Sequence, residues 1–210
     1  MGSGRKLLEA LKRSAGGPGP ELGLVVGSPP QSILRPIATR RERLNQSDVR
    51  VLTEWRNRFV TSFLTEFQAI EERTADWLVT FVGPNPNKIL FMVDDAVGNT
   101  FGYMGLDLID WEDYTGEVDA IVRGGTAPRG AMAAALTALI QWARVQLELD
   151  QIYVRVRSDN SALHFYEKIG FEEFRRVALI RRQKQNEIHW EEDETSEIGS
   201  PCLVHLRYER

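Results

Sequence analysis

Residues 116–134 (GEVDAIVRGGTAPRGAMAA) hold the first group of atoms that could do chemistry. A predicted strand ends in two glycines, and Pro128, Arg129 and Gly130 then lead directly into a helix rich in small residues. Amide groups at a helix start are unpaired and carry partial positive charge, so they could hold a diphosphate, with Arg129 adding a charged contact. An ordinary strand-to-helix connection with a glycine turn is the alternative.

Residues 154–171 (VRVRSDNSALHFYEKIGF) form the second candidate site, where a predicted strand ends in Ser-Asp-Asn before a short helix. Asn160 could pair with amide groups of an extended ligand, and Tyr166, six residues further on, could donate a proton to a leaving group. Taken singly, Asn160 reads as a helix cap and Tyr166 as a half-buried aromatic residue.

Two carboxylates precede the first candidate site. Glu117 and Asp119 are two residues apart on one predicted strand, so both side chains point to the same face. Either could take a proton from an amine or hold a substrate, and both could equally be exposed strand-end acids. His164 is predicted on the surface, and the remaining two histidines show no metal-ligand spacing, so no metal site is expected.

Apolar spacing and turn residues predict the elements that would position these groups. Helices are predicted at residues 49–59, 71–82, 131–147 and 160–169, and strands at 32–37, 89–93, 101–109, 117–123, 151–157, 171–181 and 202–208. Strand and helix alternating after a meander predict the α/β class, with helices on the faces of a mixed sheet. Residues 187–197 hold six acids and no Lys or Arg, which predicts a loop or flexible hairpin.

The first 33 residues differ in composition from the rest. They contain seven of the 17 glycines, four of the nine prolines and no aromatic residue. We expect a flexible tail over residues 1–33 and a folded domain over 34–210. Residues 4–15 could form a short basic amphipathic helix that anchors a partner or a membrane surface, but an isolated helix of this length is marginal in water, so a frayed tail is favoured.

Composition excludes several classes of protein. The 210 residues, with 42% hydrophobic and 27% charged side chains, predict one globular domain with appendages. A formal charge of −4 argues against a nucleic-acid-binding protein, and the single cysteine, Cys202, rules out an internal disulfide. No apolar run is long enough to span a bilayer and no signal peptide is present, so a cytoplasmic location is expected.

Residues 129–134 (RGAMAA) and 158–171 (SDNSALHFYEKIGF) together resemble the GNAT superfamily of acetyl-CoA-dependent N-acetyltransferases. The second motif is the more specific, because Met132 stands where the family usually has a glycine. The order of elements agrees from about residue 33 to residue 208. The resemblance implies a central mixed sheet of six or seven strands flanked by about four helices.

The resemblance also implies roles for residues. The family binds acetyl-CoA as cosubstrate, with the pantetheine along one strand and the diphosphate at a helix start. An asparagine of the second motif also contacts the cosubstrate. Those cofactor-binding positions are Ile121, Val122, Arg123, Arg129, Gly130, Ala131, Met132, Ala133, Ala134 and Asn160. The amine would attack the thioester directly in a ternary complex, with an N–H near Ile121 polarising the carbonyl, Glu117 as general base and Tyr166 protonating the thiolate.

The acceptor is expected to be a primary amine of a small molecule. Arg56, Asn57 and Asp119 are the predicted substrate-binding residues, and Arg56-Asn57 on a helix resembles GNATs that acetylate amino sugars on nucleotide carriers. A protein or peptide amine, a polyamine or an aminoglycoside are the alternatives. A GNAT-like binding module that does not catalyse the reaction is a further alternative, and the sequence leaves a homodimer open.

Overall fold

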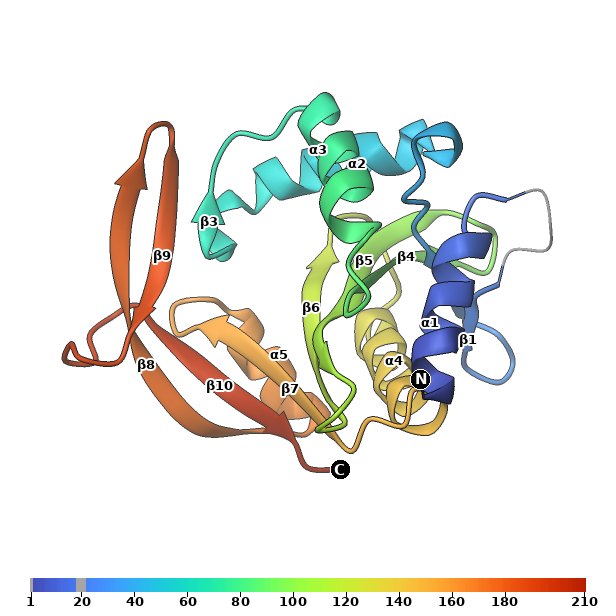
Figure 1. The fold of residues 1–210 in the computed structure, drawn as a ribbon. Helices are drawn as coiled ribbons and strands as arrows, with labels where there is room; N and C mark the ends of the chain where they lie inside the picture. Colours follow the sequence, from blue (N-terminus) through green and yellow to red (C-terminus); the bar gives the residue numbers. More distant parts are fainter. Residues whose placement is uncertain (1, 18–21) are drawn as a thin grey trace. The chain divides into compact units, whose positions relative to one another are not determined.

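A computed structural model describes residues 2–17 and 22–210 of the protein (Figure 1). The chain divides into two compact units, Met1–Thr53 with Ile70–Ile152, and Glu54–Ala69 with Tyr153–Arg210. Helix α2 (Gln46–Arg58) and strand β7 (Gln151–Arg157) each pass from one unit to the other along the chain.

The first unit is built on an antiparallel sheet. Its strands, in spatial order, are β1 (Leu24–Val26), β2 (Ser32–Pro36), β4 (Ile89–Asp95), β5 (Thr100–Asp110) and β6 (Thr115–Arg123). The central strand β4 begins with five consecutive apolar residues, 89–93, and all of them are buried. An unbroken apolar run is typical of a strand covered on both faces, so β4 lies at the centre of this unit's core.

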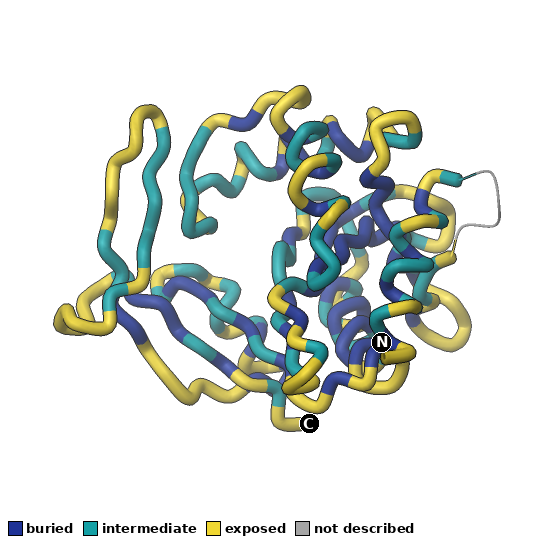
Figure 2. The backbone as a smooth tube through the Cα atoms, viewed as in Figure 1, coloured by how far each residue is buried: buried dark blue, intermediate teal, exposed yellow. Residues whose placement is uncertain are grey.

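Helix α4 (Ala131–Gln146) contacts β1, β2 and β5. Its buried residues recur every three to four positions, and its Trp142 ring packs edge-on against Phe91 of β4 at 5.8 Å. Figure 2 shows buried residues concentrated along α4 and the strands beside it. The unit also contains η1 (Arg41–Arg43) and α3 (Glu71–Trp77), which continues as a π-helical turn, η3 (Leu78–Val82).

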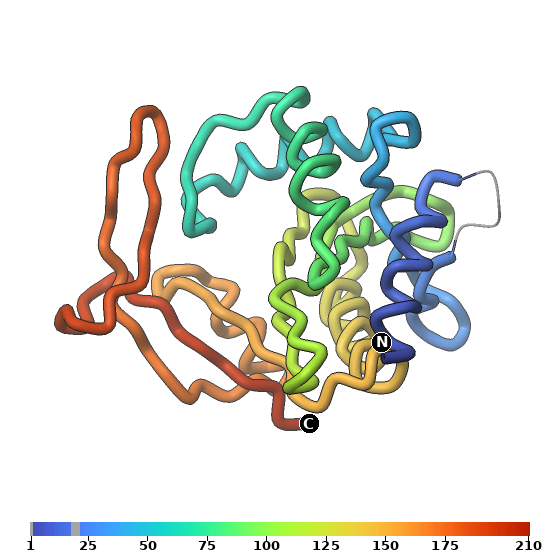
Figure 3. Tube along the Cα trace, viewed as in Figure 1, coloured from blue at the N-terminus to red at the C-terminus, as the bar shows by residue number. Residues whose placement is uncertain are grey.

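The N-terminal segment corrects the expectation of a flexible tail over residues 1–33. Residues Ser3–Ser14 form helix α1, which contacts α4, and both helices can be followed in Figure 3. Leu8 and Leu11 are buried, and a Cβ on Gly4 would lie 2.4 Å from the carbonyl oxygen of Leu147. The helix is marginal alone, but this packing supplies the apolar burial that stabilises it. Residues 18–21, within the same predicted tail, lie outside the described residues.

The second unit contains five strands in the order β7, β10 (Cys202–Tyr208), β8 (Phe171–Lys184), β9 (Glu187–Asp193) and β3 (Thr65–Glu66), and all adjacent pairs are antiparallel. Helix α5 (Ala162–Ile169) contacts β8, and η2 (Val60–Ser62) precedes β3. The acid-rich residues 187–197, expected as a loop or flexible hairpin, begin with strand β9 of the β8–β9 hairpin. Three acids of this segment form ion pairs with arginines of β8 and β7: Glu191 with Arg182, Glu194 with Arg175, and Glu192 with Arg155.

The α/β class is confirmed, with more elements than expected. The described residues contain ten strands and five α-helices, against a prediction of six or seven strands and about four helices. The additional elements are α1 and short or charged strands such as β1, β3 and β9, whose composition carries little signal. Among residues 2–17 and 22–210, no helix is both long enough and apolar enough to cross a membrane.

Candidate functional site

Strand β6 contains a bulge at residues 120–121, beside the amide that is expected to bind the thioester oxygen. Asp119 pairs with Gly105 and Val122 with Tyr103, so Ala120 and Ile121 both oppose a single residue of β5. Ala120 has a φ of 54°, a left-handed conformation that non-glycine residues adopt uncommonly. A bulge leaves one residue outside the regular ladder and redirects its amide group. This geometry supports the predicted oxyanion-binding role of an amide near Ile121.

The start of α4 has the form expected of an anion-binding helix end. Gly130, with a φ of 86°, precedes the helix, and an added Cβ there would meet no atom within 4 Å. The amide of Ala131 bonds to the Pro128 carbonyl at 3.1 Å, and that of Ala134 bonds to the Gly130 carbonyl at 2.9 Å. The first-turn amides of residues 132 and 133 are therefore the groups that a diphosphate would use. The loop fits the predicted ligand, and the exposed Arg129 borders it.

Met132 departs from the family pattern without filling this helix end. Its side chain is buried, and its sulfur lies 2.8 Å from where a Cβ on Gly102 of β5 would be. The side chain therefore packs against the sheet, where Gly102 makes room for it. The backbone amide of Met132 remains in the first turn of α4.

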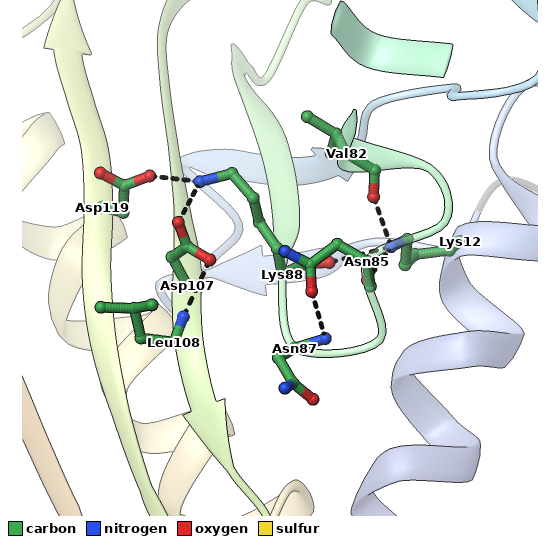
Figure 4. Close-up of polar contacts among 8 residues, drawn as sticks. All are labelled: Lys12, Val82, Asn85, Asn87, Lys88, Asp107, Leu108 and Asp119. Carbon is green, nitrogen blue, oxygen red and sulfur yellow. Dashed lines mark hydrogen bonds and ion pairs between the residues drawn. The ribbon is translucent and has the colours of Figure 1, made fainter. Parts of the chain in front are cut away.

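Asp119 takes part in a group of charged side chains shown in Figure 4. The Nζ atom of Lys88 lies 2.6 Å from a carboxylate oxygen of Asp119 and 2.6 Å from one of Asp107. Glu117 lies opposite Asp107 in the register of β5 and β6. Its side chain is on the same face of β6 as that of Asp119. Burial opposes the charge of Lys88, but the two carboxylates outweigh it and raise its pKa.

A second lysine lies close to this group. Lys12 of α1 donates hydrogen bonds to the carbonyl oxygens of Val82, Asn85 and Lys88, at 2.7, 2.6 and 3.0 Å (Figure 4). Burial and the nearby charge of Lys88 lower the pKa of Lys12 to about 8. These bonds tie α1 to the segment that precedes β4.

The second unit holds the predicted Asn160 site in a connected network. Arg157 pairs with Asp159 through two hydrogen bonds, of 3.0 and 2.7 Å, and with Glu66 of β3 at 3.2 Å. Its guanidinium stacks on Trp190 of β9, and the Trp190 indole N–H donates to Glu66 at 2.6 Å. The Asn160 side-chain oxygen accepts a hydrogen bond from the N–H of residue 162, the first residue of α5, at 2.9 Å.

Tyr166 is packed within α5. It is 6% exposed, and its ring contacts Phe165 at 5.5 Å and Phe171 at 5.8 Å. A substitution that keeps the ring is therefore needed to test its hydroxyl. His164 is exposed, as predicted, and lies 2.9 Å from Glu167.

Arg56 and Asn57, the predicted acceptor-binding pair, make local contacts in the second unit. The Arg56 guanidinium lies over Phe63 at 3.8 Å and Phe67 at 4.6 Å, and donates to the Thr65 carbonyl. The Asn57 amide donates to the Ala69 carbonyl at 3.0 Å and accepts the Ala69 N–H at 2.7 Å. Both side chains therefore hold the 59–69 segment, a structural role that the helical pattern alone did not predict.

Several contacts of the site were not expected from the sequence. Lys88 follows a Pro-Asn turn and precedes an apolar strand, a pattern that indicates only where a strand begins. Asp107 and Lys12 likewise gave no signal, because their partners are distant in sequence. In the described part of the chain, no three His, Cys, Asp or Glu residues cluster in a way that could hold a metal ion.

Comparison with known proteins identifies the class that this fold and site define. Residues 42–190 match the family model described as "Acetyltransferase (GNAT) domain". The chain therefore belongs to the GNAT acetyltransferases, and it is an acetyl-CoA-dependent N-acetyltransferase.

Solved structures with a similar fold include polyamine-acetylating enzymes. Spermidine N-acetyltransferase from Vibrio cholerae in complex with CoA and spermine has a TM-score of 0.64 at 19% identity, covering 84% of this chain and 94% of that one. A chimera of the Vibrio cholerae enzyme and hSSAT has a TM-score of 0.62 at 20% identity, covering 85% and 95%. No curated protein matches the sequence significantly. None of these comparisons supports the branch that acts on nucleotide-linked amino sugars.

Proposed function

We propose that the protein transfers the acetyl group of acetyl-CoA to a primary amine of a small cationic acceptor of the polyamine class. The observation that carries this proposal is on β6, where a partly exposed carboxylate, Asp119, directly precedes the bulge at Ala120. An ammonium group is the complement of a carboxylate at that position. The activities of the two structural relatives named above also favour a polyamine.

The proposed reaction uses the backbone of the first unit. The amine nitrogen attacks the thioester carbonyl carbon. The oxyanion that forms accepts a hydrogen bond from a backbone N–H near Ile121, and the C–S bond then breaks. The diphosphate of acetyl-CoA binds the first-turn amides of α4 and Arg129, while pantetheine pairs with residues 121–123. The amine loses a proton to Glu117 or to water, and the thiolate gains one from Tyr166.

The amino-sugar acceptor predicted from the sequence is not proposed further. That prediction depended in part on Arg56 and Asn57, and both are engaged with backbone or aromatic groups of residues 59–69. A homodimer stays a prediction, which the molar mass in solution would test.

Two measurements test the proposed function. Isothermal titration with acetyl-CoA should give saturable binding, and its absence would favour a binding module that has lost the reaction. An acceptor screen that follows CoA release should then compare spermidine and spermine with a nucleotide-linked amino sugar, an aminoglycoside and a peptide. We expect the polyamines to have the highest kcat/KM; a clear preference for another acceptor would overturn the polyamine proposal.

A further inference from the structure

Lys88 is a buried cation that links the start of β4 to acidic residues of β5 and β6. Its side chain is 4% exposed, and its Nζ atom donates to Oδ2 of Asp107 and Oδ2 of Asp119, both at 2.6 Å (Figure 4). An ammonium removed from water is tolerated when it is paired and hydrogen-bonded. Because its pKa is raised, Lys88 stays charged throughout the neutral range.

The carboxylate oxygens of this triad are not equally occupied. Asp107 uses both oxygens, because Oδ2 accepts Lys88 and Oδ1 accepts the amide of Leu108 at 2.8 Å. Asp119 uses Oδ2 for Lys88, and within the described residues its Oδ1 accepts no hydrogen bond. The Asp119 side chain is 36% exposed, whereas that of Asp107 is 22% exposed. The two carboxylates and one ammonium leave one negative charge, and Asp119 Oδ1 is the oxygen open to a further partner.

The position of Asp119 connects this charge to the reaction. Asp119 is the last residue of β6 before the bulge at Ala120 and Ile121, where the proposed function places the thioester carbonyl. We propose that Lys88 is a positioning residue, which holds Asp119 so that its Oδ1 atom receives the ammonium group of the acceptor. This inference rests on the proposed function and adds a residue that determines how the acceptor binds.

Two other charged groups surround the triad and bear on its test. Glu117 lies across from Asp107 on the same face of the sheet, and Lys12 donates to the backbone carbonyl of Lys88. The bond from Lys12 involves only the backbone of Lys88. Substitution of the Lys88 side chain therefore leaves that hydrogen bond in place, but it also removes a charge that lowers the pKa of Lys12. A substitution of Asp119, which keeps Lys88, isolates the effect of the carboxylate.

The proposed role predicts the sign of the effect of losing Lys88. A residue that acted only as a counter-charge would weaken acceptor binding, so its removal would strengthen attraction for a cationic amine. A positioning residue does the opposite. Without Lys88, Asp107 and Asp119 repel each other, and the partly exposed Asp119 side chain turns into water, so acceptor binding weakens.

The experiment compares Lys88→Met, Lys88→Arg and the control Lys6→Met, with spermidine as the probe amine. Lys6→Met removes the same charge from an exposed position on α1. Steady-state CoA release gives kcat and the KM for spermidine, and isothermal titration gives the Kd for acetyl-CoA. Circular dichroism and thermal melting confirm that each variant is folded.

We expect Lys88→Met to raise the spermidine KM about tenfold or more, as for loss of one charged hydrogen bond, while the acetyl-CoA Kd changes less than about twofold. Lys88→Arg can keep both ion pairs, so its spermidine KM should stay close to that of the wild type. A KM that falls or stays unchanged in a folded Lys88→Met protein would overturn the positioning role.

A second variant keeps the inference testable if Lys88→Met does not fold. Asp119→Asn keeps an oxygen for Lys88 and removes the remaining charge, so it should raise the spermidine KM about tenfold or more without changing acetyl-CoA binding. An unchanged KM would overturn the inference. A wild-type protein that binds acetyl-CoA but acetylates neither spermidine nor spermine would overturn the proposed polyamine acceptor, and the anchor with it. A wild-type protein that acetylates spermidine, with a KM that Lys88→Met and Asp119→Asn leave unchanged, would overturn the anchor alone.

Discussion

Replacing Leu8 by alanine tests whether helix α1 is part of the folded protein. The Leu8 side chain is fully buried, and Lys12, one turn further along α1, donates to the carbonyl oxygens of Val82, at the end of η3, and of Asn85 and Lys88 before β4. Loss of a buried leucine side chain costs the transfer free energy of the removed carbons and leaves a cavity, together about 2–5 kcal/mol. At about 3 kcal/mol, a chain of this length would show a melting temperature lowered by roughly 6–12 °C.

Leu7→Ala is the matched control, because Leu7 lies on the same helix with its side chain half-buried. Differential scanning calorimetry and urea titration of both variants measure the melting temperature and the free energy of unfolding. We expect Leu7→Ala to cost clearly less than Leu8→Ala. If Leu8→Ala melts within about 1 °C of the wild type, α1 does not contribute to stability and the description of residues 3–14 as a flexible tail would stand.

Three further predictions concern the chemistry and the charges. Arg129→Ala should weaken acetyl-CoA binding about tenfold, as for loss of one charged contact, and an unchanged Kd by isothermal titration would remove Arg129 from the diphosphate site. Tyr166→Phe keeps the packed ring and should lower kcat by about 10²–10⁴-fold with the acetyl-CoA Kd little changed; a kcat within about twofold of wild type, when chemistry limits the rate, would refute proton donation. The folded-state pKa of Lys12 is about 8, below its ordinary value, so between about pH 8 and 10.5 the unfolded chain binds more protons than the folded chain. The wild type should therefore gain stability relative to Lys12→Met as the pH rises through this range. Urea midpoints across this range measure the difference, and a flat difference would mean that the three carbonyl bonds keep Lys12 charged.

The elements that carry the acetyl-CoA motifs could be predicted from sequence. Three local patterns predicted these elements: the apolar face of α4, the alternation of buried residues in β7 and the glycine that ends α5. Each pattern involves only residues that are close together in the sequence. Element types and most boundaries were therefore predicted correctly, and the two motifs identified the GNAT class that the family match confirms. The acceptor was not predictable in the same way, because the Arg56-Asn57 pair is a short motif whose partners lie in a loop.

The remaining features depend on residues that are far apart in the chain. Nothing in the composition of α1 shows that Leu8 and Leu11 would be covered, because the surface that covers them is formed by other segments of the first unit. The bulge at Ala120 has no sequence signal, since alanine rarely adopts a positive φ and does so here within the β5–β6 pairing.

Sequence alone thus predicted the class of enzyme and its cosubstrate, because two local motifs, residues 129–134 and 158–171, resemble those of the GNAT superfamily. Only the tertiary structure decided which charges meet. Lys88 is 19 residues from Asp107 and 31 from Asp119, and the antiparallel register of β4, β5 and β6 brings the three side chains together. Their pairing is set by that register and by burial, which raises the cost of leaving any one of these charges unpaired.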